Sequence, residues 1–171
     1  MKPTAEKVIR HFGLEPLPGE GGLYRQTYCA AERIAREALP ARYGHDKPLS
    51  TAIVYLLTPE ADSFSALHRL PTDEVYHFYA GDPVDLLLLH PDRRGDLVRL
   101  GSDFMDDEHV QFVVPRGVWQ GSRLAAGGAW ALLGATMAPG YTDTDYVHGA
   151  RAELLARYPE FAAEIGKLTR A

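Results

Sequence analysis

The stretch SALHRLPTDEVYHFYAGDPVDLLLLH, residues 65–90, decides how this chain is read. It places His68 and His77 on either side of an Asp73-Glu74 pair, and a Gly-Asp-Pro turn then leads into a run of leucines. Side chains alternate along a strand, so Glu74, Tyr76 and Phe78 share one face. His68 ends the preceding strand, and the tight turn LPTD brings it back opposite Glu74. We therefore expect His68 and Glu74 to meet inside a barrel and His77 to point away.

Short β-rich runs at a spacing of about ten residues continue on both sides of this stretch. No helical run interrupts them, which favours an antiparallel sandwich or barrel over a βαβ fold. A short helix is expected from about Thr4 to Phe12, and helical spacing returns near the C-terminus, where Pro159 begins a second helix. The strands are expected at 22–28, 50–57, 63–68, 74–79, 83–90, 96–101, 109–115, 118–124 and 129–138.

Bulk properties exclude several classes of protein. The chain has 171 residues, 46% of them hydrophobic and 24% charged, as in an ordinary soluble domain. Its net charge of −5 disfavours a nucleic-acid partner. No run is long enough to span a bilayer, so no membrane partner is expected. The single cysteine, Cys29, forbids an internal disulfide and fits a reducing cytoplasm.

Two of the expected strands, AIVYLL and VDLLLL, are apolar on both faces. A strand with one face in water should alternate, so the outer faces of these two must be covered. Terminal helices or a second subunit could cover them. We expect a homodimer, because two small helices cannot cover much surface.

The 65–90 stretch resembles the first sequence motif of the cupin superfamily, with His68, Glu74 and Gly81 at matching positions. Residues 109–124 resemble the second motif through Pro115 and Gly117. The wider pattern of GGLYRQTY, STAIVYLL, HRLPTDEVYHFYAGDP, VPRGVWQ and APGY is similar to the small single-domain branch of unknown function often written cupin 5. The resemblance implies one jelly-roll β-barrel domain over residues 1–171, an all-β double-stranded β-helix with short N- and C-terminal helices. It also implies a ligand pocket in the barrel mouth.

The usual cupin metal is held by three histidines and a glutamate. Here Leu70 and Gln120 stand where two of those histidines belong. An amide oxygen is a poor substitute for imidazole with iron, copper or zinc. We therefore expect no metal and no other cofactor.

The candidate catalytic residues are His68, Glu74 and Tyr76, and Gln120 is a candidate ligand-binding residue. Tyr24, Gln26 and Tyr28 share one strand face that is too polar for a dry core, so we place them on the pocket wall. A neutral histidine beside a carboxylate and a tyrosine can pass protons. By analogy with the jelly-roll sugar-nucleotide epimerases, His68 would be the base and Tyr76 or Tyr24 the acid.

Three functions stay open at this point. The first is metal-independent epimerase or isomerase chemistry on a small polar, carbohydrate-like ligand. The second is non-catalytic binding of a small molecule, and the third is a metal-dependent cupin enzyme with a reduced ligand set. The sequence does not identify the substrate or decide between these functions.

Overall fold

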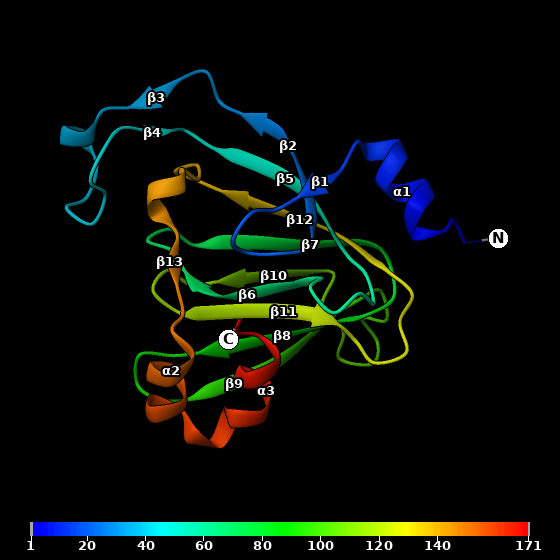
Figure 1. Ribbon diagram of the computed structural model, residues 1–171. Helices are drawn as coiled ribbons and strands as arrows, with labels where there is room; N and C mark the ends of the chain where they lie inside the picture. Colours follow the sequence, from blue (N-terminus) through cyan, green and yellow to red (C-terminus); the bar gives the residue numbers. More distant parts are fainter. Residues whose placement is uncertain (1, 171) are drawn as a thin grey trace.

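The computed structural model describes residues 2–170 and shows two antiparallel sheets packed face to face (Figure 1). The larger sheet has six strands in the order β1-β2-β5-β12-β7-β10. Its strands are β1 (Glu15–Pro16), β2 (Leu23–Cys29), β5 (Thr51–Leu57), β7 (Glu74–Gly81), β10 (Gln111–Val114) and β12 (Ala131–Met137). This arrangement confirms the predicted jelly-roll barrel.

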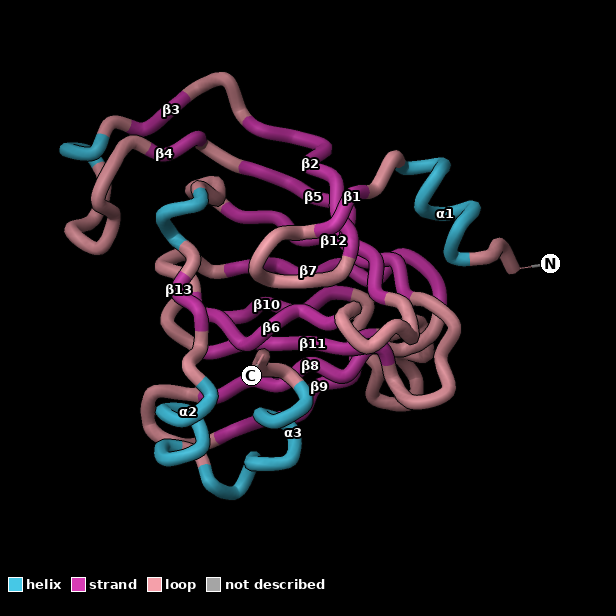
Figure 2. Tube along the Cα trace, in the orientation of Figure 1, coloured by secondary structure: helices cyan, strands magenta, loops and turns pink. Residues whose placement is uncertain are grey.

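The smaller sheet has five strands in the order β13-β6-β11-β8-β9. Its strands are β6 (Phe64–Arg69), β8 (Val84–Leu89), β9 (Gly95–Leu100), β11 (Trp119–Leu124) and β13 (Val147–His148). The two short strands β3 (Arg33–Ile34) and β4 (Lys47–Pro48) form a separate ribbon. This ribbon and the 3-10 turn η1 (Arg36–Ala38) extend beyond the barrel as an arm (Figure 2).

All nine strands expected from the sequence are present, within one or two residues of their predicted bounds. The strands that sequence reasoning missed are β1, β3, β4 and β13, each of two residues. A two-residue strand has no measurable alternation, so its pairing is set by its neighbours and not by its own sequence.

The core lies between the two sheets and follows the period-two pattern. On β8, Val84, Leu86 and Leu88 point inward and pack with Tyr76 and Phe78 of β7. The mouth of the barrel lies at the end where His68, Glu74 and the arm meet, and this end carries the site.

Helix α1 (Ala5–Phe12) covers the outer face of β5. Thr4 caps its first turn by accepting a hydrogen bond from the Lys7 amide, and Gly13 ends it in the left-handed conformation. Val8 packs against Leu56, which is fully buried. The outer face of AIVYLL is therefore covered within one chain.

The C-terminal helices cover the outer face of β8. They are α2 (Arg151–Arg157), the 3-10 turn η3 (Pro159–Phe161) and α3 (Ala162–Lys167), all packed below the five-stranded sheet in Figure 1. Leu154 and Ile165 bury Leu87 and Leu89. The expectation that two small helices could not cover these strands was wrong, because each contributes large side chains to a compact second core. The reason given for a homodimer therefore fails, and the homodimer itself stays a prediction.

Candidate functional site

A cavity of about 400 Å³ opens at the barrel mouth between the two sheets and the arm. Its polar lining comes from β2, β3, β5, β6, β7, the loop before β2 and the loop after β12. The lining includes Glu20, Tyr24, Gln26, Cys29, Arg33, Thr51, Tyr55, His68, Glu74, Tyr76, Tyr141, Thr142, Asp143 and Tyr146. A volume of this size suits a small organic ligand.

His68 reaches the cavity because β6 carries a bulge. Ser65 pairs with Ser122 and His68 pairs with Gln120, so three steps along β6 match two along β11. His68 is 2% exposed, and its Nδ1 lies 2.8 Å from the Ala66 carbonyl oxygen. A carbonyl can only accept, so Nδ1 carries the proton and Nε2 keeps its lone pair. The backbone carbonyl of Ala66 therefore orients the imidazole, and Glu74 does not.

Glu74 and Gln120 join the two sheets at the base of the cavity. The Gln120 Nε2 amide donates a hydrogen bond of 2.7 Å to Glu74 Oε2. Both side chains are buried, and Gln120 Oε1 has no hydrogen-bond partner among residues 2–170. Gln120 therefore holds the Glu74 carboxyl in position, but it is not among the residues that line the cavity.

Burial gives Glu74 an unusual acidity. Removal of the carboxyl from water raises its pKa from 4.5 to about 7. A positive charge on His68, present when its imidazole is protonated, and the Gln120 hydrogen bond oppose this rise, and the charge of Glu20 adds to it. Glu74 can therefore exchange a proton near neutral pH, which is the range required of a general acid or base.

Tyr76 lies on the same inward face of β7 as Glu74, as strand alternation predicted. Burial raises the pKa of its phenol, so the hydroxyl keeps its proton. His77 points to the outer face, where its Nε2 lies 3.0 Å from Thr136 Oγ1. The parity argument for β7 is confirmed.

On β2 the prediction from strand alternation is right for Tyr24 and Gln26 and wrong for Tyr28. Tyr24 and Gln26 line the cavity, but Tyr28 does not and is 54% exposed. The pairing of β2 with β5 shifts between Gln26 and Tyr28, so a bulge at Thr27 reverses the faces that follow. Cys29 faces the cavity instead.

The β1–β2 loop places Glu20 in the cavity wall, a residue that sequence reasoning missed. Ser65 Oγ donates a hydrogen bond of 2.6 Å to Glu20 Oε1. Tyr55 donates to the Gly21 carbonyl at 2.8 Å, which ties the same loop to β5. The available sequence signal for this loop was Tyr55 inside the apolar run AIVYLL, because a buried tyrosine hydroxyl needs a hydrogen-bond partner.

The loop of residues 141–146 closes one side of the cavity and was also missed. Tyr146 stacks on His68 with ring centroids 4.8 Å apart, and its hydroxyl is buried with no partner among residues 2–170. Its signal was weak, because only the two tyrosines in APGYTDTDY distinguish this loop from an ordinary polar turn.

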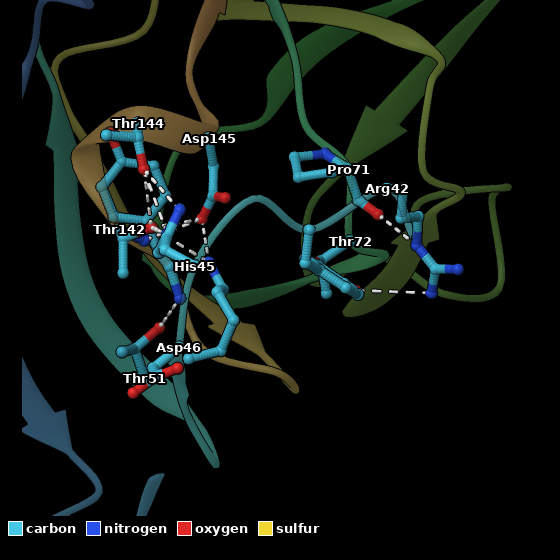
Figure 3. A network of polar contacts seen from close by, with 12 residues as sticks. Arg42, His45, Asp46, Thr51, Pro71, Thr72, Thr142, Thr144 and Asp145 are labelled. Carbon is cyan, nitrogen blue, oxygen red and sulfur yellow. Dashed lines mark hydrogen bonds and ion pairs between the residues drawn. The ribbon is translucent and has the colours of Figure 1, made fainter. Parts of the chain in front are cut away.

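A buried polar network holds the 141–146 loop in place (Figure 3). Lys47 of β4 is fully buried and forms an ion pair with Asp145. Lys47 also donates to Thr142 Oγ1 at 3.1 Å, and His45 Nε2 lies 2.7 Å from the same oxygen. Breaking a buried pair would leave an uncompensated charge, so this network fixes Tyr146 over His68.

The donors at the base of the cavity do not fit the metal that cupins commonly hold. Leu70, an apolar residue, lines the wall where a second imidazole would be needed. The Gln120 amide donates to Glu74, and residues 2–170 contain no group of three or more His, Cys, Asp or Glu side chains that could hold a metal ion. One imidazole and one carboxylate are too few for a transition-metal site.

Comparison with known proteins identifies relatives of this architecture. A family model described as "Cupin superfamily (DUF985)" matches residues 6–148. The structure is similar to a protein from Shewanella oneidensis, with 31% identity, 99% of each chain covered and a TM-score of 0.84. A hypothetical protein from Leishmania major has 32% identity and a TM-score of 0.85, over 99% of this chain and 100% of that one.

A more distant likeness is to oxalate decarboxylase of Bacillus subtilis. The identity is 14% and the TM-score 0.53, over 92% of this chain and 38% of that one, which shows the fold alone. No curated protein matches the sequence.

Proposed function

Because the chain belongs to the cupin superfamily, in the DUF985 family, we propose that it binds a small polar ligand in the barrel cavity and moves a proton on it without a metal. One observation carries the proposal. His68 has its Nδ1 committed to the backbone, which leaves Nε2 to accept a proton, and the same cavity is lined by the buried carboxyl of Glu74, whose pKa is about 7. This is the arrangement that a general base requires.

The proposed step is proton abstraction from a carbon next to a carbonyl group. His68 Nε2 takes the proton and becomes an imidazolium, which the nearby Glu74 carboxylate stabilises. A tyrosine hydroxyl then supplies a proton to the same carbon from the other face and becomes a phenolate, and the proton held by His68 passes through solvent to this phenolate, which restores both groups. The net result is an epimerisation or isomerisation with no redox change.

The charges of the lining favour a neutral or cationic ligand. Glu20, Glu74 and Asp143 supply three carboxyl groups, and Arg33 supplies the single guanidinium. The aromatic rings of Tyr24, Tyr55, Tyr76, Tyr141 and Tyr146 add flat apolar surface. A sugar-like polyol fits both features, because its C–H faces stack on aromatic rings while its hydroxyls meet polar groups.

Three tyrosines can act as the proton donor. Tyr76 and Tyr24 follow from the sequence, and the structure adds Tyr146. Tyr146 differs from the other two in that its ring stacks on His68, and its hydroxyl is buried without a partner within the described residues.

The test is deuterium uptake from heavy water by a panel of neutral aldoses and ketoses, followed by proton NMR. We expect incorporation at the carbon next to the carbonyl, and its loss with His68→Asn. The proton donor is the tyrosine whose replacement, in Tyr76→Phe or Tyr146→Phe, stops exchange while the sugar still binds. Absence of exchange from every sugar that binds would contradict the catalytic proposal.

Non-catalytic binding is the second candidate, and the existing Glu74–Gln120 hydrogen bond favours it. A carboxyl already committed to an amide can serve as part of a fixed polar floor. A binder keeps its affinity in His68→Asn and shows no exchange in the wild-type protein. Mass spectrometry of small molecules that copurify with the protein supplies the ligand for this comparison.

The proposed setting is a reducing cytoplasm, with a small molecule and no nucleic acid or membrane as partner. Cys29, the only cysteine of the chain, is exposed and unpaired, which suits a reducing compartment. No helix within residues 2–170 has the length and apolarity needed to cross a membrane.

A further inference from the structure

A second hollow lies on the other side of the 141–146 loop, and we call it the arginine pocket. Its volume is about 490 Å³, and Leu70 is the only residue that it shares with the barrel cavity. Three of its lining residues are arginines, from three separate segments of the chain. The arginine pocket is lined by Arg42, Gly44, His45, Arg69, Leu70, Pro71, Arg116, Gly117, Thr144, Asp145 and Val147.

Two of the three guanidinium groups are held in place by aromatic rings. Arg42 lies 4.7 Å from the centre of the Tyr43 ring, and its Nε donates to the Pro71 carbonyl at 3.0 Å. Figure 3 shows Arg42 beside Pro71 and Thr72. Arg69 lies 4.8 Å from the centre of the Trp119 ring. Guanidinium groups positioned in this way lose less conformational entropy when they bind a ligand.

The positive charge of the arginine pocket is only partly compensated. Among residues 2–170, Arg42 and Arg69 form no ion pair with a carboxylate. Arg116 has a weak partner in Asp73 at 3.9 Å. Asp145 belongs to the lining, but its charge is neutralised by buried Lys47. A cluster of this sign is unexpected on a chain whose net charge is −5.

We propose that the arginine pocket binds the phosphate group of a small molecule. Arginine forks match phosphate oxygens with two parallel hydrogen bonds. A tetrahedral oxyanion presents acceptors in several directions and can meet three forks at once, whereas a planar carboxylate cannot. This site is separate from the barrel cavity, and it does not depend on the proton transfer proposed there.

The first experiment measures the binding of inorganic pyrophosphate by calorimetry at low salt. The double variant Arg42→Gln/Arg69→Gln removes two exposed guanidinium groups, and we expect its affinity to fall about tenfold or more. Arg10→Gln is the matched control, because Arg10 is equally exposed on α1, away from β13 in Figure 1. Equal affinity in the double variant and the control would overturn the proposal.

The second experiment maps the site on the wild-type protein, so its result does not depend on whether a variant folds. Pyrophosphate is titrated into labelled protein, and backbone amide shifts are followed by NMR. We expect the largest shifts at residues 42–45, 69–70 and 116–117, and a much weaker response to acetate. Shifts centred instead on Arg33 would place the anion in the barrel cavity mouth and refute the assignment, and so would equal responses to the two anions.

Discussion

Glu74 is the residue whose behaviour depends most on its surroundings, and this gives a pH prediction. The folded protein holds the Glu74 proton up to about pH 7, while an unfolded chain releases it near 4.5. Between these values the folded state binds more protons, so the contribution of Glu74 to stability is fully present below pH 4.5 and is lost as pH rises toward 7. The difference amounts to about 3 kcal/mol. We expect Glu74→Gln to flatten this part of the profile, measured by urea unfolding at several pH values. An unchanged slope in the variant would show that Glu74 titrates normally.

Residue positions within the site could be predicted where strand alternation is regular or where a tight turn brings two side chains opposite each other. Glu74 and Tyr76 are found in the cavity, and His77 outside it, as alternation predicted, and His68 is found in the cavity as the turn before Glu74 predicted. Tyr28 was misplaced because no residue in LYRQTYC marks the bulge that reverses its face. Glu20 and Tyr146 were missed for a different reason. They lie in loops whose course is set by contacts with distant strands, and those contacts leave no periodic pattern in the sequence.

At the level of elements, the C-terminal helices cover the outer face of β8, which the sequence analysis expected a second subunit to cover. Leu154 of α2 is 2% exposed and packs on the outer face of β8. We expect Leu154→Ala to lower the free energy of unfolding by about 2–4 kcal/mol, because it leaves a cavity against Leu87 and Leu89. Leu155→Ala, at a half-buried neighbouring position, is the matched control and should cost clearly less. Chemical denaturation measures both, and similar losses would indicate that the helices do not seal the sheet.

The existence and type of the long elements were predictable because their patterns are strong. Nine strands follow from short β-rich runs at a spacing of about ten residues, and α1 is found close to the helix expected from about Thr4 to Phe12. Which element covers which face was not predictable, because AIVYLL and VDLLLL are equally apolar whether a helix or another chain lies against them. That choice depends on where α1 and residues 150–168 pack, and helical spacing alone does not show it.

For the whole molecule, part of the outer face of the six-stranded sheet still presents apolar side chains to solvent. Tyr28, Tyr79 and Val113, from β2, β7 and β10 of this sheet, are about half exposed. We keep the homodimer as a prediction and place its contact on this face. Light scattering should give about twice the chain mass of 18.9 kDa, and Tyr79→Glu should halve the value. A wild-type mass of one chain at micromolar concentration would contradict the dimer.

The metal content of the purified protein tests whether the base of the cavity can hold a transition metal. Catalytic metal sites generally supply three protein ligands and leave one position open. Here His68 offers one lone pair, Glu74 is engaged by Gln120, and Leu70 takes the place of a second imidazole. Even a mutation of a residue that only hydrogen-bonds to a metal ligand typically lowers metal affinity about 10–100-fold. The absence of two imidazole ligands should lower it far more. We expect elemental analysis of untagged protein to find well under one equivalent of iron, manganese, nickel or zinc per chain. His68→Ala should leave that value unchanged. Near one equivalent in the wild type, lost in His68→Ala, would make metal-dependent catalysis the better account of the site.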